Sequence, residues 1–374
     1  MGVGNYLHCD YCCLTRQVRL DLINERAVVA HMLSEALLDE FDARGVVVVP
    51  NVLSPCEVAE CRALFHEYLL LHDVNIENLI ETGCNLRELS STGGSGGVLD
   101  VFYEDWKLKV NEHYNVVGAM QQLWGHTYGG HRELYAHPYG VFDCNRGYMY
   151  IDRVCFRVPD TISSLHSISK KKTLQRSLTP HLDCCPHKLY SSNTENKIPK
   201  WRPIQAFIAL TDTLEKDQGG FEACPGLHKE FDEWISRRPP TKIIDTNGQQ
   251  IESEPPCVGE FTPIRPREDA EIISRFEHVP CRAGDMVCWD YRIPHGNSKR
   301  NNTDIVREAI YVGLLPAVEM NKVYALNQLH DFINGNVPKD QWHDTSSKQT
   351  TTHEFTKLGR KLMAMDSWDE ISEV

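Results

Sequence analysis

The stretch Thr179-Pro180-His181-Leu182-Asp183 decides the fold that this sequence predicts. Side chains two residues apart on a β-strand point to the same face, so His181 and Asp183 can bind one ion while the residue between them faces the core. Prolines on both sides of the triplet confine this strand to a few residues, as expected near the mouth of a barrel. A third ligand must then come from another strand.

His295 is the candidate for that third ligand. It lies in Pro294-His295-Gly296, at the end of a hydrophobic strand that begins at Ala283. Taken alone, a His-x-Asp triplet is more often a surface or core pair, and a histidine between proline and glycine is usually a turn residue. Together, two imidazoles and one carboxylate form the facial ligand set of a non-haem Fe(II) centre, which leaves positions open for a co-substrate and O2.

A jelly-roll barrel accounts for the wide separation of these ligands, because it places strands distant in sequence side by side. The sequence predicts a mainly β protein with flanking helices around such a double-stranded β-helix, or cupin-like, core. We expect an N-terminal extension over residues 1–27 and one domain over 28–335. Within that domain we expect helical support at about 28–130 and the jelly-roll core at about 145–316. A polar tail with a short helix follows at 336–374.

Local patterns predict the individual elements. Ser54-Pro55-Cys56-Glu57 supplies an N-cap, a proline at the first helical position and a capping-box glutamate. The glycine-rich segment 90–97 lacks the Lys-Ser/Thr ending of a phosphate-binding loop, so we expect a flexible surface loop there. The expected elements are helix, strand and helix over 30–72, a helix over 108–128, strands at 148–158, 204–210, 285–290 and 305–312, and a hairpin turn at Asn247-Gly248.

Composition excludes several classes of function. The chain has 374 residues, a formal net charge of −13 and a sequence pI near 5.7, which argue against general affinity for nucleic acid or an anionic membrane. No apolar run is long enough for a membrane-spanning helix. The sequence gives no basis for predicting the oligomeric state.

The chain has 14 cysteines and no secretory signal pattern, so we expect reduced thiols in the cytoplasm. His8, Cys9, Cys12 and Cys13 resemble half of a zinc site, but structural thiols are favoured because a second Cys/His pair is missing nearby.

Arg307 is the candidate anchor for a co-substrate. It lies in an apolar strand, where a guanidinium is costly unless it meets an anion. Its expected neighbours on the same face are Ile305, Ala309 and Tyr311. A salt bridge to an internal carboxylate explains Arg307 equally well without the metal ligands. With them, a carboxylate co-substrate is the better explanation, since the planar guanidinium binds a carboxylate through two hydrogen bonds.

Over about residues 40–316 the chain resembles the phytanoyl-CoA dioxygenase family of Fe(II)- and 2-oxoglutarate-dependent oxygenases. The segments that carry the resemblance are Gly45–Leu53, Pro180-His181-Leu182-Asp183, Leu210-Thr211-Asp212, Gly219-Gly220-Phe221, Pro225-Gly226-Leu227-His228-Lys229, Gly284-Asp285, His295-Gly296, Asn302 and Arg307. Leu227 stands where the family usually has serine. The aromatic residue usual near the co-substrate is not evident around Ala209-Leu210.

The resemblance implies roles for single residues. His181, Asp183 and His295 would bind iron, Arg307 would pair with the distal carboxylate of 2-oxoglutarate, and Ser298 or Thr303 would add a hydroxyl to it. The reaction implied is hydroxylation of an unactivated C–H bond of a small organic substrate, with O2 consumed and succinate and CO2 released. Related halogenases lack the carboxylate ligand, so Asp183 favours hydroxylation.

Other polar residues are weaker candidates. Gln205 is an amide in an apolar strand, where it either points toward the co-substrate or is a satisfied core amide. Arg153 and Arg157 share one face and either bind an anionic group or form structural ion pairs, which are favoured. For the remaining candidates a supporting or packing role is favoured: Cys184, His187, Trp289 and Tyr291.

Two other functions stay open. One is a catalytically silent metal-binding jelly-roll module, since a fold does not fix a function. The other is a cupin-like metal enzyme that does not use 2-oxoglutarate, and Arg307 argues against it.

Overall fold

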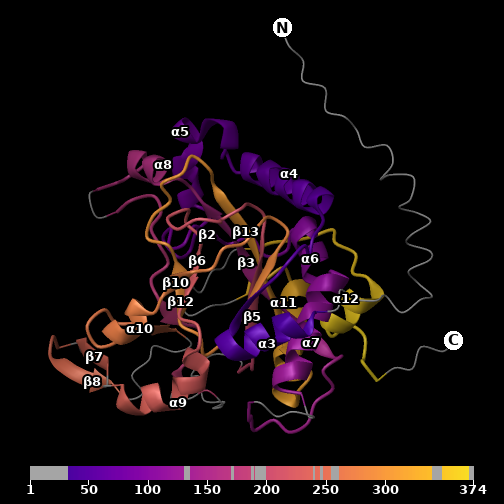
Figure 1. Ribbon diagram of the computed structural model, residues 1–374. Coiled ribbons are helices and arrows are strands. Elements are labelled where there is room, and N and C mark those ends of the chain that lie inside the picture. Colours follow the sequence, from indigo (N-terminus) through magenta and orange to yellow (C-terminus); the bar gives the residue numbers. More distant parts are fainter. Residues whose placement is uncertain are drawn as a thin grey trace.

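A computed structural model describes residues 33–129, 135–169, 172–186, 189, 199–238, 241–244, 247–253, 261–338 and 348–369. The predicted N-terminal extension, its cysteines and His187 lie outside these residues. Within them the chain forms two antiparallel β-sheets with helices around them (Figure 1).

The larger sheet contains the long strands predicted from β-branched and aromatic runs. Its order is β1 (Val46–Val49), β11 (Met286–Asp290), β5 (Ile204–Ala209), β13 (Arg307–Pro316), β3 (Gly147–Arg157) and β2 (Val98–Leu99). All neighbouring strands are antiparallel. The central strand β13 pairs with β5 on one side and with β3 on the other, and it shifts register between Ile310 and Val312.

The smaller sheet is built from short strands. Its order is β10 (Glu277–His278), β6 (Phe221–Ala223), β12 (His295–Asn297), β4 (His181–Leu182) and β9 (Thr262–Pro263), again all antiparallel. Strands β4 and β12 are neighbours although more than a hundred positions separate them. A separate hairpin is formed by β7 (Thr241–Ile244) and β8 (Gln250–Ser253), and the predicted turn at Asn247-Gly248 lies between them.

The helices follow the order of the chain. They are α3 (Glu35–Arg44), α4 (Pro55–Leu71), η1 (Ile76–Asn78), α5 (Leu79–Thr82), η2 (Gly83–Arg87), α6 (Asp105–Asn111), α7 (Tyr114–Thr127), α8 (Asp160–Leu165), α9 (Leu227–Arg237), α10 (Ala270–Ser274), α11 (Glu319–Ile333) and α12 (Lys357–Leu362). In Figure 1, α4, α6, α7, α11 and α12 lie on one side of the molecule, while α9, α10 and the β7–β8 hairpin lie at another.

Successive side chains of the larger sheet point to opposite faces, so the hydrophobic core has two parts. Residues such as Ile208, Cys288 and Ile310 belong to a large cluster that includes the buried residues of α4, α6 and α7. Their neighbours Phe207 and Ala309 belong to a second cluster, which includes residues of the smaller sheet. Because side chains on a strand alternate between faces, the larger sheet packs against helices on one face and against the smaller sheet on the other.

Several local predictions are confirmed. The helix, strand and helix expected over 30–72 are α3, β1 and α4, and Ser54 and Glu57 form the expected capping box. The single helix expected over 108–128 is instead two helices, α6 and α7. The strand expected at 305–312 begins only at Arg307, so Ile305 precedes it and is exposed instead of sharing a strand face with that arginine.

The glycine-rich segment 90–97 is not the flexible surface loop that we expected. Gly94, Gly96 and Gly97 are buried and have positive φ. A Cβ on Gly94 would lie 2.2 Å from the carbonyl oxygen of Leu174, and one on Gly97 would lie 2.7 Å from the Cα of Arg157. Glycine is therefore required here because other backbone segments lie too close for a side chain.

The C-terminal part packs against the core. Helix α12 lies in the segment predicted to be a polar tail with a short helix, and Leu362 and Met363 are buried in the cluster beneath the helices.

Candidate metal centre

The predicted iron ligands come together on the smaller sheet. His181 on β4 is paired directly with His295 on β12, and Asp183 follows β4 immediately. The Nε2 atoms of His181 and His295 each lie 3.4 Å from an oxygen of Asp183. Together they form the one such group of His, Cys, Asp and Glu found in the described part of the chain that could hold a metal ion. Ligand atoms about 2.1 Å from one ion and at right angles lie about 3 Å apart, so this spacing fits a single ion.

Hydrogen bonds orient both imidazole rings. Nδ1 of His181 lies 2.7 Å from the carbonyl oxygen of Thr179, and Nδ1 of His295 lies 3.0 Å from that of Ile293. A carbonyl can only accept, so each Nδ1 carries a proton, and each Nε2 is the ring nitrogen that faces Asp183 and could bind a metal. Metal-binding histidines are commonly oriented by such a bond from the other ring nitrogen.

The charges of the site favour ligands ready for a cation. Burial alone would raise the pKa of Asp183, but His181 and His295 lower it well below its usual range. Burial lowers the pKa of His295, and the neighbouring His181 lowers it further. The carboxylate is therefore ionised and the His295 imidazole neutral near pH 7, which are the protonation states that metal ligands require.

Gln205 and Arg202 hold the carboxylate ligand. Nε2 of Gln205 donates to Oδ2 of Asp183 at 2.7 Å, and Nη2 of Arg202 lies 3.7 Å from the same oxygen. Sequence analysis left Gln205 either as a residue that points toward the co-substrate or as a satisfied core amide, and both ends of its amide are bonded within the protein. Sequence analysis did not identify Arg202. Arg202 precedes β5 next to a proline, and no local pattern distinguishes it from a surface arginine.

Aromatic rings close the space beside His295. Phe221 and Trp289 lie 5.8 and 4.9 Å from the His295 ring, measured between centroids, and Phe207 lies 5.5 Å from Phe221. Phe207 lies on β5, the strand that ends at Ala209, and its ring faces the same space between the sheets. Trp289 also donates from Nε1 to Oε1 of Gln205 at 3.0 Å, so it packs in the core and fixes the amide that holds Asp183.

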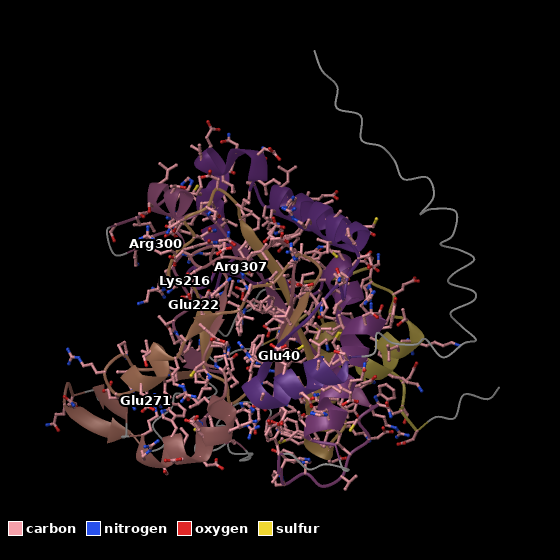
Figure 2. The ribbon with its side chains drawn as sticks, viewed as in Figure 1. Glu40, Lys216, Glu222, Glu271, Arg300 and Arg307 are labelled. Atoms are coloured by element: carbon pink, nitrogen blue, oxygen red, sulfur yellow. The ribbon has the colours of Figure 1, made fainter. Side chains whose placement is uncertain are left out.

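Arg307 begins β13 and enters the space between the sheets. Its guanidinium carbon lies 5.1 Å from the centroid of the Phe207 ring, and its Nη1 lies 3.1 Å from Sγ of Cys155. Arg307 is 3% exposed, and its Nη2 has no hydrogen-bond partner among the described residues. Figure 2 shows Arg307 within the body of the molecule. A buried, unpartnered guanidinium nitrogen fits a carboxylate that enters from the site.

The two predicted hydroxyl donors have partners within the protein. Ser298 is buried, and its Oγ donates to Oδ1 of Asp217 at 3.1 Å. Oγ1 of Thr303 donates to Oδ1 of Asn301 at 2.8 Å, within the turn that precedes β13. Their proposed contact with 2-oxoglutarate stays a prediction.

Arg153 and Arg157 take different partners on β3. Nε of Arg153 donates to Oδ1 of Asp100 at 2.7 Å, and Nη2 of Arg157 donates to Oδ1 of Asp160 at 3.0 Å. Each therefore makes an ion pair, as the sequence favoured, and Nε and Nη1 of Arg157 have no partner among the described residues.

Most cysteines in the described residues are free thiols, as expected. Cys185 is disulfide-bonded, so the prediction of reduced thiols is wrong at that position. Next to it, Sγ of Cys184 lies 3.6 Å from the carbonyl oxygen of Tyr291.

One protein-family model matches part of the chain. Residues 184–365 match a model described as Gig2-like. The matched segment contains His295 and Arg307, and it begins immediately after Asp183. No curated protein matches the sequence.

The resemblance to solved structures covers more of the chain than residues 184–365. GIG2 (DUF1479) from Candida albicans is 15% identical with a TM-score of 0.64, over 91% of this chain and 78% of that one. The hypothetical protein JW0805 from Escherichia coli is 15% identical with a TM-score of 0.62, over 89% and 82%. These likenesses show a shared fold. The α-ketoglutarate-dependent carbocyclase SnoK from nogalamycin biosynthesis is more distant, at 20% identity and a TM-score of 0.44, over 76% and 85%.

Among the described residues, no helix combines the length and the apolar character needed to cross a membrane.

Proposed function

We propose that this protein is an Fe(II)- and 2-oxoglutarate-dependent dioxygenase that hydroxylates a C–H bond of a small organic substrate. One observation carries the proposal. Three oriented ligand atoms of His181, Asp183 and His295 converge on one point, and Arg307 has an unpartnered nitrogen in the same inter-sheet space. The donor set fits iron, and the arginine fits the distal carboxylate of 2-oxoglutarate.

The chain's own residues have separate tasks in this proposal. His181, Asp183 and His295 would hold the metal, and as only three protein ligands they would leave it able to bind a 2-keto acid and O2. Iron with these two co-substrates supplies the oxidising chemistry and releases succinate and CO2. Gln205 keeps the Asp183 carboxylate in place through its hydrogen bond. The rings of Phe207, Phe221 and Trp289 exclude water from the space between the sheets.

The finer structural predictions belong to the same proposal. Two antiparallel sheets that face each other, with the ligands on one and Arg307 on the other, support a jelly-roll core and kinship with the phytanoyl-CoA dioxygenase family. We further propose that the enzyme acts in the cytoplasm.

Arg307 separates this function from the two alternatives. A silent metal-binding module or a cupin-like enzyme without 2-oxoglutarate does not need a buried, unpartnered cation near its metal. An apolar residue at position 307 would pack against Phe207 at lower cost.

The direct test is anaerobic addition of Fe(II) and 2-oxoglutarate, with visible absorbance followed for the metal-to-ligand charge-transfer band. We expect the band in wild type and its loss in His181→Ala, because the metal site then lacks one ligand. His137→Ala is the matched control, since the ring of that histidine contacts the Trp201 ring, with 4.5 Å between centroids, outside the ligand set. Absence of the band in folded wild-type protein would overturn the proposal.

A further inference from the structure

Arg157 lies directly opposite Arg307 on the neighbouring strand of the larger sheet. Residues that face each other across an antiparallel pair project from the same face. That face is the one toward the smaller sheet, because Cys155, two residues before Arg157, belongs to the cluster between the sheets. Two arginine side chains therefore leave the sheet together at the end of β3 and the start of β13.

Both guanidinium groups are buried and incompletely partnered. Arg157 is 2% exposed, and only its Nη2 has a partner, Asp160. Its Nε and Nη1 have no acceptor in the residues that the structure describes. Arg307 likewise has a contact from Nη1 to Cys155 and none from Nη2. Three buried nitrogens on two adjacent cations thus lack acceptors, which is costly because each has lost its hydrogen bonds to water.

The nearby carboxylate does not balance this charge. Asp160 is shared, since its Oδ2 lies 2.8 Å from Nε of Arg300 while its Oδ1 accepts from Arg157. Burial lowers the pKa of Arg157, Asp160 raises it, and the positive charge of Arg307 lowers it. Two like charges at a buried site repel each other, and an anion between or beside them offsets this repulsion.

We propose that Arg157 and Arg307 together bind the distal carboxylate of 2-oxoglutarate, so that the co-substrate is held by a two-arginine site. The inference rests on the proposed function and adds Arg157 to its binding residues. A carboxylate has two oxygens with about four acceptor positions, enough for both guanidinium groups. Its charge also relieves their repulsion. The site therefore selects 2-oxo acids that carry a second carboxylate.

The test compares two ligands in Mn(II)-loaded protein by isothermal titration calorimetry. 2-Oxoglutarate has the distal carboxylate, and 2-oxopentanoate has the same carbon chain without it. We expect Arg157→Gln to weaken 2-oxoglutarate binding about tenfold or more, since a charge-assisted hydrogen bond is lost, and to leave 2-oxopentanoate binding unchanged. The double variant Arg157→Gln/Arg307→Gln should lose 2-oxoglutarate affinity by a smaller factor than the product of the two single-variant factors. The reason is that both residues bind one group.

Two further variants test the charge argument. Asp160→Asn removes the carboxylate that competes for Arg157, so 2-oxoglutarate should bind more tightly. Arg153→Gln is the matched control, because Arg153 lies on the same strand but pairs with Asp100, and it should leave 2-oxoglutarate affinity unchanged. Circular dichroism establishes that each variant is folded. If Arg157→Gln does not fold, Arg157→Lys and Asp160→Asn decide the question, with opposite expected signs.

The outcomes separate this inference from the proposed function. Unchanged 2-oxoglutarate affinity in Arg157→Gln, with reduced affinity in Arg307→Gln, overturns the two-arginine site and leaves the function standing. Equal weakening of both ligands in Arg157→Gln also overturns it, because the effect is then not on the distal carboxylate. If Mn(II)-loaded wild type binds no 2-oxoglutarate, both fall together.

Discussion

Gln205 donates a hydrogen bond from Nε2 to Oδ2 of Asp183, across 2.7 Å, from the larger sheet to the end of β4 in the smaller one. Its Oε1 accepts from Trp289, which fixes the orientation of the amide. The carboxylate of Asp183, a candidate metal ligand, is therefore positioned by a residue outside the candidate ligand set. Hydrogen-bond partners of this kind commonly change metal affinity when they are removed.

We expect Gln205→Leu to lower Mn(II) or Fe(II) affinity by about 10- to 100-fold, because Asp183 loses its donor. Metal titration calorimetry measures this directly. Gln328→Leu is the matched control: Gln328 is also a buried amide, but it bonds to the backbone of Met149 and Ile151 beneath α11. It should lower stability and leave metal affinity unchanged. Equal metal affinity in wild type and Gln205→Leu would remove Gln205 from the site.

Substitutions at two adjacent residues of β13 should have different effects, one on ligand binding and the other on stability. Arg307 faces the site, whereas Glu308 faces the helices and accepts from Arg62 at 3.0 and 3.1 Å and from His66 at 3.0 Å. Arg307→Gln should weaken 2-oxoglutarate binding about tenfold or more, with metal affinity nearly unchanged. Glu308→Gln should instead lower the free energy of unfolding by about 1–3 kcal/mol, with unchanged 2-oxoglutarate affinity. The reverse pattern would place the wrong residue in the site.

The Glu308 pair also predicts a pH dependence. Burial alone would raise the pKa of Glu308, but hydrogen bonds from His66 and Arg62 lower it below its usual range. The stability contributed by Glu308 is present above its unfolded pKa and is lost as pH falls through the lower folded value. Urea unfolding across acidic pH should show wild type losing more stability than Glu308→Gln as pH falls. Parallel curves would contradict this.

Metal addition should stabilise the fold by mass action. An ion that binds only the native state adds about 2.7 kcal/mol when its concentration is 100 times the Kd. We therefore expect Mn(II) to raise the Tm of wild type in differential scanning fluorimetry, and EDTA to reverse the rise. Asp183→Asn should show little response, while its metal-free Tm reports whether it is folded. A metal-induced rise of equal size in this variant would place the ion elsewhere.

Lys107 lies fully buried in α6, with Nζ 3.4 Å from the carbonyl oxygen of Phe102. Burial lowers the pKa of Lys107 to about 7, against a partial opposing effect of Asp152. The unfolded chain binds this proton up to the ordinary lysine pKa, so stability should rise with pH from about 7 to about 10.5. Below pH 7 the cost of burial is constant.

We expect Lys107→Met to raise the free energy of unfolding at pH 7 by about 1 kcal/mol or more and to abolish the rise with pH. Lys109→Met on the same helix is the control, because that lysine is half-exposed and pairs with Asp105, and it should change little. Urea unfolding at several pH values measures both. A destabilised Lys107→Met would show that the contact with Phe102 outweighs the cost of burying the amine, and an intact rise with pH would assign that rise to another group.

Local chemistry made much of the fold predictable. The helix start at Ser54 depends on residues within four positions, and the strands follow runs of β-branched and aromatic residues. His181 and Asp183 were also predictable as a pair, because the period of a strand places them on one face. These interactions join residues near in sequence, so their geometry follows from the sequence itself.

Pairing between distant strands was not predictable in the same way. Nothing near Arg157 in the sequence indicates that it faces Arg307, and nothing near Gln205 indicates that it bonds to Asp183. The glycines of 90–97 appeared to be a flexible loop because the backbone that packs against them comes from residues 157 and 174–176. Strand register and sheet packing decide these contacts through the whole core at once.

The sequence by itself thus determined which side chains are candidates to bind a metal and a carboxylate: His181, Asp183, His295 and Arg307. Only the tertiary structure decided that Gln205 holds the metal-binding carboxylate and that Arg157 joins Arg307 between the sheets. The physical reason is that residue type and short-range spacing fix chemistry, whereas the position of one strand against another is set by burial of the shared core.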